Sequence, residues 1–565
     1  MKFFSTFFFF LVVLNSMLSQ TKDTVGVLDK AKEHVKISGG IGALGTFYQS
    51  TTMDSTRNPI FYQLNANLNI KVGSVSIPFS AVLNQQESKV SQPFNQYGLS
   101  PRYKGITAHL GYRTLKFSDY SLSGNQFLGV GADINPKNSM VRGKALYGRF
   151  AKEIVPTINP MGDIIGVPNL SRFGYGAMIE VGKRSNAIGV LVFKARDNLS
   201  SDSLLNQDAT LKPGENLIFG VTTKQKISKK LSLKGEIDWS AYTKDLRNEE
   251  SVMEGFSYLN NISPLFHANS SSTLTKAIKA DLDYSLRKVK LGLAYRRIDP
   301  GYRTMGSVYL NNDFEDIQAK STFRLFKNKL TLGGSFGIQR NNLDDSKYTE
   351  MLRVISSLNA NYTINEHWVV NGMYSNFNSS SHSVLTKDID TDSLRYIQVT
   401  RNSALQIMYA KANKVRRIAV SLRGNYQAAQ TENIDATSIN YVYNSALGVQ
   451  YGFIKTGLNI NLSLNGAKNI NATSEITTIG PSLALSKRFL SGKLNTSLGF
   501  SVLKTIYDMS SGAIISTKIL GTYKVNRHHN FNLSLSDLDK TTIISTTDKT
   551  HANELVISLG YNYSF

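Results

Sequence analysis

The sequence predicts an all-β protein, a transmembrane antiparallel up-and-down β-barrel of about 24–26 strands. Residues 35–565 have room for about 25 strands, and such barrels have an even number, so 24–26 strands are expected and 26 is slightly favoured. Three observations predict it. The chain ends in an amphipathic strand with aromatic residues, apolar–polar alternation recurs along the chain, and the connections alternate between short and long.

The last eleven residues, 555–565, place apolar or aromatic side chains at every second position and mostly small or polar ones between them. Strand side chains alternate between two faces, so one face of this strand is apolar. We expect it to close the barrel against a strand near residue 35, with its aromatic end at the lipid interface. The residues assigned to closure and assembly are Ile557, Leu559, Tyr561, Tyr563 and Phe565.

The first residues resemble an export signal. Lys2 precedes an apolar run, 3–14, which is too short to span a membrane as a helix, since that takes about 20 residues. We therefore expect a signal peptide at 1–19, a short periplasmic segment at 20–34 and the barrel at 35–565. The chain has no cysteine, which excludes a lipid anchor on cysteine, disulfides and thiolate metal sites.

Alternation with a period of two is the second observation. In 231–242, for example, Ile237 and Trp239 oppose Glu236 and Asp238. Other segments of this kind are 279–286, 289–296, 417–423 and 454–465. Each segment is weak evidence alone, but together they favour a sheet that is apolar on one side only.

The connections between these segments supply the third observation. Short polar turns are expected near 229–230, 287–288, 327–328, 365–366, 413–414, 452–453, 491–492 and 526–529. Long polar stretches are expected near 197–214, 244–273, 300–315, 379–396, 429–437 and 541–552. Short periplasmic turns and long extracellular loops are typical of outer-membrane barrels, whereas a soluble β-sandwich has no reason for this rhythm.

A barrel of this size encloses a wide lumen. The segment before residue 35 is too short for a plug domain, so we expect inward-folded loops or a bound partner to occlude the lumen. Residues 87–138 alternate poorly and are the first candidate for lumenal material, although an ordinary extracellular loop explains them equally well.

The formal net charge is +23. Part of this excess lies opposite the apolar faces and would point into the lumen, where it would favour anionic solutes or an acidic partner. These basic residues are Lys234, Lys279, Lys290, Arg296, Arg417, Arg423 and Lys455. The alternative is that Lys and Arg mark strand ends and turns and contact lipid phosphates there. Acidic residues share the same faces, which weakens the case for anion selectivity.

No catalytic, cofactor-binding or metal-ligating residue is assigned. His382 in a Ser-rich stretch and the pair 528–529 are interpreted as solvated residues, because no nucleophile–base set can be assigned without geometry. Carboxylates near one long connection (Asp299, Asp313, Glu315 and Asp316) match no defined calcium loop. No aromatic-basic module for nucleic acid is present.

The export signal, the Tyr/Phe-ended last strand and the Asn-, Ser- and Tyr-rich strands resemble outer-membrane barrels of the Bacteroidota. The segments 92–101 and 297–302 are similar to that group's large barrels. The resemblance implies a role in nutrient uptake, secretion or surface-protein anchoring and does not choose among them.

The sequence thus predicts a non-enzymatic outer-membrane barrel that acts as a pore or as a transport, secretion or surface-protein partner. The alternative is a barrel enzyme acting on lipid or polysaccharide. The expected partners are outer-membrane lipid and lipopolysaccharide, the barrel assembly machinery and a lumen-occluding or surface protein.

Overall fold

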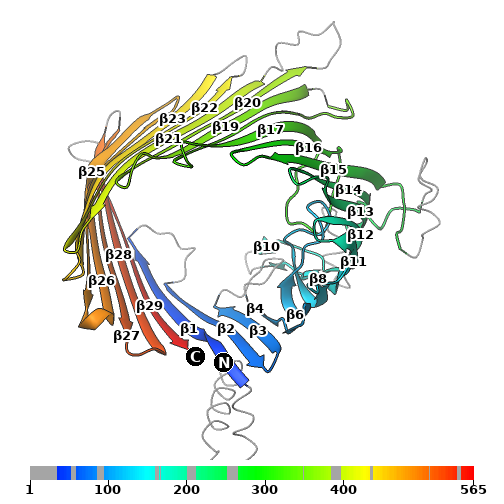
Figure 1. The fold of residues 1–565 in the computed structure, drawn as a ribbon, viewed down its shortest axis with the longest axis horizontal. Helices are drawn as coiled ribbons and strands as arrows, with labels where there is room; N and C mark the ends of the chain where they lie inside the picture. The colour runs from blue at the N-terminus through cyan, green and yellow to red at the C-terminus, as the bar shows by residue number, and fades with distance from the viewer. Residues whose placement is uncertain are drawn as a thin grey trace, which may run out of the picture.

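The chain forms one closed antiparallel β-barrel of 26 strands. Figure 1 shows the computed structural model, with the strands arranged as the wall of the barrel. The structure describes residues 35–51, 59–85, 95–158, 164–165, 167–199, 211–250, 265–347, 349–383, 396–432, 437–507, 510–543 and 549–565. The predicted fold class and the favoured strand number are confirmed. The expected signal peptide and periplasmic segment lie outside the described residues.

The first half of the barrel contains the irregular strands. Its strands are β1 (Val35–Ser50), β2 (Ile60–Val72), β3 (Val75–Asn84), β4 (Gln96–Leu99), β5 (Arg102–Tyr103), β6 (Ile106–Thr114), β7 (Gln126–Ile134), β8 (Val141–Ala151), β11 (Arg172–Lys183), β12 (Asn186–Asp197), β13 (Glu215–Lys226), β14 (Leu231–Thr243) and β15 (Ser272–Ser285). The short β4 and β5 share one position, because each pairs with β3 and β6. A separate hairpin, β9 (Thr157–Ile158) with β10 (Ile164–Ile165), lies between β8 and β11.

The second half consists of regular strands joined in sequence order. They are β16 (Val289–Ile298), β17 (Phe314–Leu325), β18 (Leu330–Arg340), β19 (Thr349–Thr363), β20 (Trp368–Ser383), β21 (Tyr396–Ala412), β22 (Arg416–Glu432), β23 (Thr437–Phe453), β24 (Leu458–Ile470), β25 (Glu475–Phe489), β26 (Leu494–Tyr507), β27 (Ser511–Lys524), β28 (His529–Ile543) and β29 (Lys549–Ser564). A single turn of 3-10 helix, Leu490–Gly492, joins β25 to β26.

Strand β29 closes the barrel against β1, as predicted. Their register runs from Gly40 opposite Ser564 to Ser50 opposite Glu554. Thr46 and Ser558 add a hydroxyl–hydroxyl hydrogen bond of 3.1 Å on the lumenal side of this seam. The backbones approach so closely that a Cβ on Gly40 would stand 2.7 Å from a carbonyl oxygen of β29. Closure leaves no free sheet edge, which a barrel in lipid requires.

The outer surface of the barrel is apolar. Alternate side chains project outward and stay exposed, for example Val190 at 60%, Leu293 at 55% and Leu559 at 62%. Such an extended apolar surface is stable against lipid rather than water. Aromatic pairs flank this surface at the end of the short turns, with ring centroids 4.7–5.0 Å apart. These pairs are Trp368 with Tyr409, Tyr451 with Phe453, Phe531 with Tyr561, and Tyr563 with Phe565.

No helix among the described residues is long and apolar enough to cross a membrane.

The connections at the two ends of the barrel differ, as the sequence predicts, but the contrast fades toward the C-terminus. The expected long stretches 429–437 and 541–552 are mostly strand. In the first, β22 ends at Glu432 and β23 begins at Thr437, and in the second, β28 ends at Ile543 and β29 begins at Lys549. The alternation in 454–465 is also misleading at its start. Residues 454–457 form a turn, so Lys455 lies in that turn and not on a strand face.

Exchanging Leu559 for Arg tests the orientation of the closing strand. Leu559 faces outward, and an Arg on a lipid-facing barrel position costs about 2–4 kcal/mol near the bilayer midplane. We expect Leu559→Arg to lower the free energy of unfolding from lipid vesicles, measured by urea titration of Trp fluorescence. The neighbouring Ser558→Arg, on the lumenal face, is the matched control and should cost far less. Equal losses would contradict the assignment of faces.

Candidate functional site: the barrel lumen

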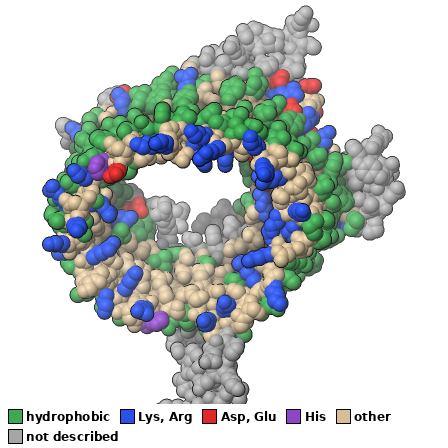
Figure 2. All heavy atoms as spheres, viewed as in Figure 1, with side chains coloured by type: hydrophobic (Ala, Val, Ile, Leu, Met, Phe, Trp, Pro, Cys, Tyr) green, Lys and Arg blue, Asp and Glu red, His purple; other side chains and the backbone are tan. Residues whose placement is uncertain are grey.

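The described residues leave a wide opening through the barrel (Figure 2). Lys and Arg side chains gather around the visible rim and on the inner wall, and Asp and Glu are much scarcer on this face (Figure 2). The opening has two unlike walls. In the part of the chain that the structure describes, loops that fold inward cover one wall, and the other wall is an uncovered sheet with a polar groove.

Two loops cover the first wall, 115–125 between β6 and β7 and 299–313 between β16 and β17, and we call them the lumenal loops. They hold each other, since the Tyr302 hydroxyl donates a hydrogen bond to the carbonyl of Tyr120 (2.9 Å) and the Ser123 amide donates to the carbonyl of Gly306 (3.0 Å). Of the described part of the region 87–138, therefore, 115–125 is lumenal material. Residues 96–114 and 126–134 are mostly strand, and 86–94 lie outside the described residues.

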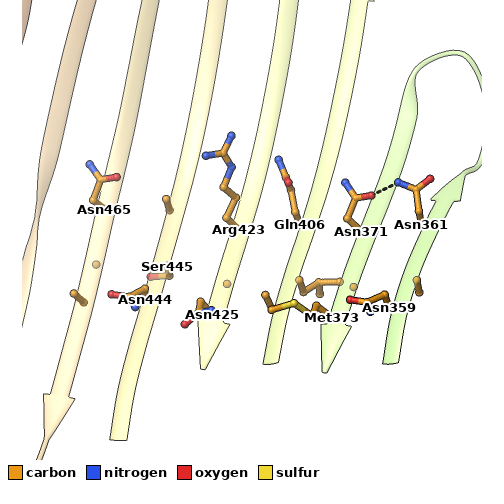
Figure 3. A pocket seen from close by; sticks show the side chains of 18 of the residues that line it. Asn359, Asn361, Asn371, Met373, Gln406, Arg423, Asn425, Asn444, Ser445 and Asn465 are labelled. Carbon is orange, nitrogen blue, oxygen red and sulfur yellow. Dashed lines mark hydrogen bonds between the residues drawn. The ribbon is translucent and has the colours of Figure 1, made fainter. Parts of the chain in front are cut away.

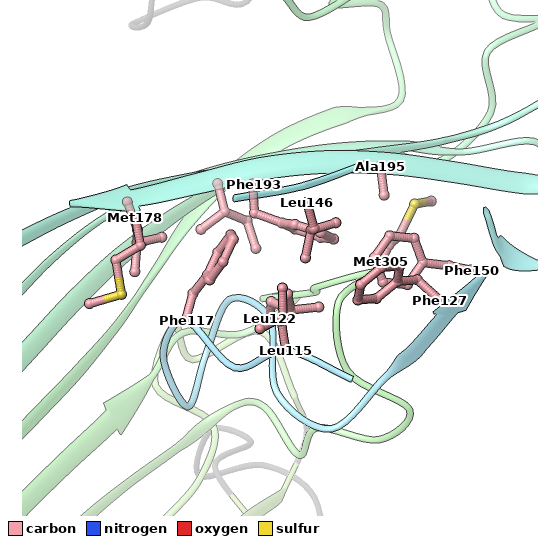
Figure 4. Close-up of a cluster of buried hydrophobic side chains, with 12 residues drawn as sticks. Leu115, Phe117, Leu122, Phe127, Leu146, Phe150, Met178, Phe193, Ala195 and Met305 are labelled. Carbon is pink, nitrogen blue, oxygen red and sulfur yellow. The ribbon is translucent and has the colours of Figure 1, made fainter. Parts of the chain in front are cut away.

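A hydrophobic cluster inside the barrel joins the lumenal loops to the wall (Figure 4). Its members from the loops are Leu115, Phe117, Leu122 and Met305. Its members from the inward faces of β7, β8, β11, β12 and β13 are Phe127, Leu146, Phe150, Met178, Leu191, Phe193, Ala195 and Ile218. Leu122, Phe127 and Phe193 are fully buried. The loops are thus docked by burial of apolar surface, which is the dominant favourable term in packing.

Polar contacts fix the position of the loops along the wall. The amide of Asn216 donates to the carbonyl of Arg303 (3.4 Å) and its oxygen accepts from the amide of Met305 (3.2 Å). The Ser118 hydroxyl donates to the buried Asp238 carboxylate (2.9 Å). The Glu236 carboxylate accepts two backbone hydrogen bonds from the 115–125 loop, at 2.9 and 3.1 Å. The wall therefore satisfies the backbone groups that docking removes from water.

Asp119 carries the main charge contact of the 115–125 loop. Its carboxylate accepts from Lys279 of β15 at 2.6 Å and also from Lys116. Burial raises the pKa of Asp119, but the hydrogen bonds from Lys116 and Lys279 outweigh burial, so the pKa lies below its usual value. Burial also raises the pKa of the Tyr120 and Tyr302 hydroxyls.

The lowered pKa of Asp119 predicts acid-sensitive docking. A carboxyl group whose folded pKa is lowered contributes stability above its unfolded pKa, about 3.9 for Asp, and loses it as the pH falls through the folded pKa. We expect the protection factors of the 115–125 amides, which remove the intrinsic pH dependence of exchange, to be high and constant between about pH 5 and 8 and to fall below about pH 4. Asp119→Asn should raise the exchange rate already at pH 7, and unchanged exchange in that variant would contradict the assignment.

The opposite wall carries a groove of about 820 Å³ across β18–β26. Neighbouring strands place amide side chains in two rows at matching levels (Figure 3). The first row runs through Asn361, Asn371, Gln406, Arg423 and Asn465, and the second through Asn359, Met373, Asn425 and Asn444. We call this surface the amide groove. Arg423 is its one charged side chain among the residues that line it.

Most of the amide groove offers unused hydrogen-bonding groups. Asn361 donates to Asn371, and Asn465 donates to Ser463 and Ser482 at 3.3 and 3.1 Å. Asn359, Gln406, Asn425 and Asn444 make no side-chain hydrogen bond to any other described residue. A side-chain amide supplies both donors and acceptors, so this wall suits hydrated or polar solutes in passage.

The predicted lumenal basic residues have different surroundings. Lys234, Lys279, Lys290, Arg296, Arg417 and Arg423 occupy inward strand positions, as judged from the exposed apolar neighbours that alternate with them. Lys279 is paired with Asp119, and Arg296 with Asp316 at 2.8 Å. Lys234, Lys290, Arg417 and Arg423 form no salt bridge with any described residue. Lys455 is in the β23–β24 turn, away from this set.

Further inward strand positions add to this basic set. They include Lys36, Lys71, Arg113, Arg142, Lys144, Lys224, Lys320, Arg324, Arg353, Arg488, Lys518 and Lys540. The inward acidic residues among the described strands are Asp133, Glu180, Asp197, Glu236, Asp238, Asp281, Asp283, Asp316 and Glu554. The wall is therefore net basic, and a low-dielectric boundary strengthens the field of such charges within the lumen.

The carboxylates near the 299–313 loop form salt bridges with Arg and Lys side chains of the same chain. Asp299 pairs with Arg297 (3.1 Å), Asp313 with Lys347, Glu315 with Arg340 (2.7 Å) and Asp316 with Arg296. No group of three or more candidate metal ligands occurs among the residues that the structure describes. His382 lies in β20, but its side chain is outside the described residues.

No protein-family model matches the chain, and no curated protein sequence matches it. Solved structures that resemble it in outline include the P pilus usher PapC translocation pore (9% identity, TM-score 0.35, covering 94% of this chain and 99% of that one). The FrpB iron transporter from Neisseria meningitidis, F5-1 variant, is 13% identical with a TM-score of 0.39, covering 95% and 84%. OccK5 (OpdH) of Pseudomonas aeruginosa is 11% identical with a TM-score of 0.30, covering 78% and 99%. Similarities this low carry no argument about function.

Proposed function

We propose that the chain is an outer-membrane pore for small polar solutes, with a preference for anions. The observation that carries this proposal is the wide opening with a net basic, amide-rich wall (Figure 2). A water-filled lumen is the typical interior of large barrels with a polar inner face, and rings of Lys and Arg favour anions in such pores. The outward apolar surface and its aromatic pairs support a location in a bilayer.

Among the described residues, the lumenal loops narrow this passage from one side. They rest on the wall formed by β7–β14, while the amide groove of β18–β26 faces the remaining space. A solute would therefore pass between docked loops and a hydrogen-bonding wall. This arrangement supports permeation of hydrated polar molecules rather than an apolar tunnel for lipids.

The partner-protein version and the enzyme alternative make different demands. The first requires a protein that fills the lumen or binds the loops. The second requires a nucleophile, a base and an orienting group within hydrogen-bond reach. Ser100 and His109 are in contact at 3.1 Å, but His109 makes no hydrogen bond to a carboxylate among the described residues. The assignment to the Bacteroidota rests on the sequence resemblance and stays a prediction.

Liposome swelling tests the pore proposal. Purified barrel in proteoliposomes should admit small neutral sugars and, faster at equal size, monocarboxylate anions. Protein that migrates on gels as a folded, heat-modifiable barrel yet gives no swelling would overturn the proposal. A protein that co-purifies in mild detergent and blocks swelling when added back would then favour the partner version.

A further inference from the structure

A second, smaller pocket lies in the lumenal wall near the end of the short turns. Its volume is about 230 Å³. The inward faces of β7, β8, β11 and β13 and the turns after β7 and β11 form it, and Phe117 of the 115–125 loop lies beside Met178 on its apolar side. Figure 4 shows Phe117 and Met178 together at one end of the hydrophobic cluster. The pocket shares no lining residue with the amide groove.

The pocket is rich in cations. Arg142, Lys144, Arg184 and Lys224 line it together with Asp133 and Glu180, so four cations face two carboxylates and a formal excess of two positive charges remains. Glu180 is shared by two of the cations, since Arg142 Nε donates to it at 2.7 Å and Lys224 at 3.2 Å. Arg142 is only 7% exposed, so its guanidinium is held in one place by the wall.

The other two cations have no carboxylate partner among the described residues. Lys144 donates to the carbonyl of Lys116 at 2.9 Å, and Arg184 donates to the side-chain oxygen of Asn135 at 2.8 Å. Asp133 is the cross-strand neighbour of Lys144, yet no salt bridge joins them and one oxygen of Asp133 is buried without a hydrogen-bond partner. Lys144 and Arg184 are therefore held by neutral acceptors, and the pocket as a whole, with Asp133 and Glu180 counted, keeps a formal excess of two positive charges.

We propose that this pocket binds the phosphate group of a small solute that crosses the lumen, an inference that rests on the proposed pore function. A guanidinium fork and ammonium groups are the donors that phosphate oxygens accept most strongly. The formal excess of two positive charges matches a phosphate dianion, and partial burial strengthens the attraction. The pocket opens on the lumenal side of the barrel, so its ligand comes from solution and not from the lipid headgroups around the outer surface.

Calorimetric titration of the purified full-length barrel with inorganic phosphate at low salt tests this site. We expect saturable binding with one phosphate per chain. Lys144→Gln with Arg184→Gln should weaken it about tenfold or more, because losing two charge-assisted contacts costs at least about 1.4 kcal/mol. Both substitutions lie at the pocket surface, which avoids disturbing the buried Arg142. Lys414→Gln with Lys455→Gln, in two other short turns, is the control of equal charge and should bind phosphate as the parent protein does.

The outcomes separate the two proposals. Chloride conductance without phosphate binding, an equal loss in the control variant, or tighter binding of succinate than of phosphate would overturn the phosphate site and leave the pore intact. Phosphate binding by a barrel that does not conduct would overturn the pore and leave the site. Phosphate added on the side of the short turns should also reduce chloride conductance in the parent protein and not in the Lys144/Arg184 double variant.

Discussion

Replacing Leu122 by Asp should release the lumenal loops from the wall and enlarge the single-channel conductance. Leu122 is fully buried in the cluster that joins the 115–125 loop to β7–β13. An unpaired carboxylate at this position costs several kcal/mol of desolvation, and loss of the Leu side chain costs about 2–5 kcal/mol more. The barrel wall has its own closed hydrogen-bond ladder, so the loops should undock while the barrel stays folded.

Planar-bilayer recordings measure this effect, and two variants control it. Leu122→Met keeps the volume and the apolar surface, so its conductance should match that of the parent protein. Ser501→Asp adds the same charge on an inward position of β26, far from the cluster, and should change selectivity without enlarging the conductance. A folded Leu122→Asp barrel with unchanged conductance would show that the docked loops do not narrow the passage.

Exchanging the four unpaired lumenal cations for Glu should reverse the ion selectivity from anions to cations. Lys234, Lys290, Arg417 and Arg423 form no salt bridge within the described structure, so each exchange acts on the lumen and leaves no buried partner behind. Each exchange removes one positive charge and adds one negative charge. The local potential should therefore change sign over much of the β14–β22 wall.

The control for this experiment carries the same change of net charge on residues outside the lumenal wall. Lys229, Lys230, Lys414 and Lys455 are exposed in short turns, and their exchange for Glu should shift the reversal potential much less, because solvent screens charges more than about 10 Å away at 0.1 M salt. An equal shift in the two fourfold variants would show that charge at the mouth, rather than along the wall, sets selectivity.

The fold followed from the sequence because its signals are local and repeated. Strand alternation, turn residues and the aromatic ending of β29 are properties of short segments. In a barrel, alternation and turn residues recur from strand to strand, so weak local signals add up. Closure of β29 on β1 was predictable since the chain offers one amphipathic strand near each end. The same reasoning wrongly placed Lys455 on an inward strand face. The apolar–polar alternation continues through residues 454–457, but these residues form the turn between β23 and β24.

The lumenal site was only partly predictable, since it depends on contacts between distant segments. Nothing periodic marks 115–125 as a docked loop, and several of its partners lie far away in the sequence, such as Tyr302, which donates to the carbonyl of Tyr120 from 182 residues away. The apolar inward residues Phe127 and Phe193 break the rule that lumenal positions are polar, and that departure was the available signal. The amide groove was missed because inward Asn residues are common in any hydrophilic barrel wall. Only the strand register shows that the Asn side chains of neighbouring strands lie side by side.

The reversal potential of the parent protein in a planar bilayer under a tenfold KCl gradient tests the central claim most directly. A net basic lumen predicts stepwise channels whose reversal potential has the sign for chloride permeating faster than potassium. Folded, heat-modifiable protein that gives no channels, or channels that favour potassium, would contradict the account.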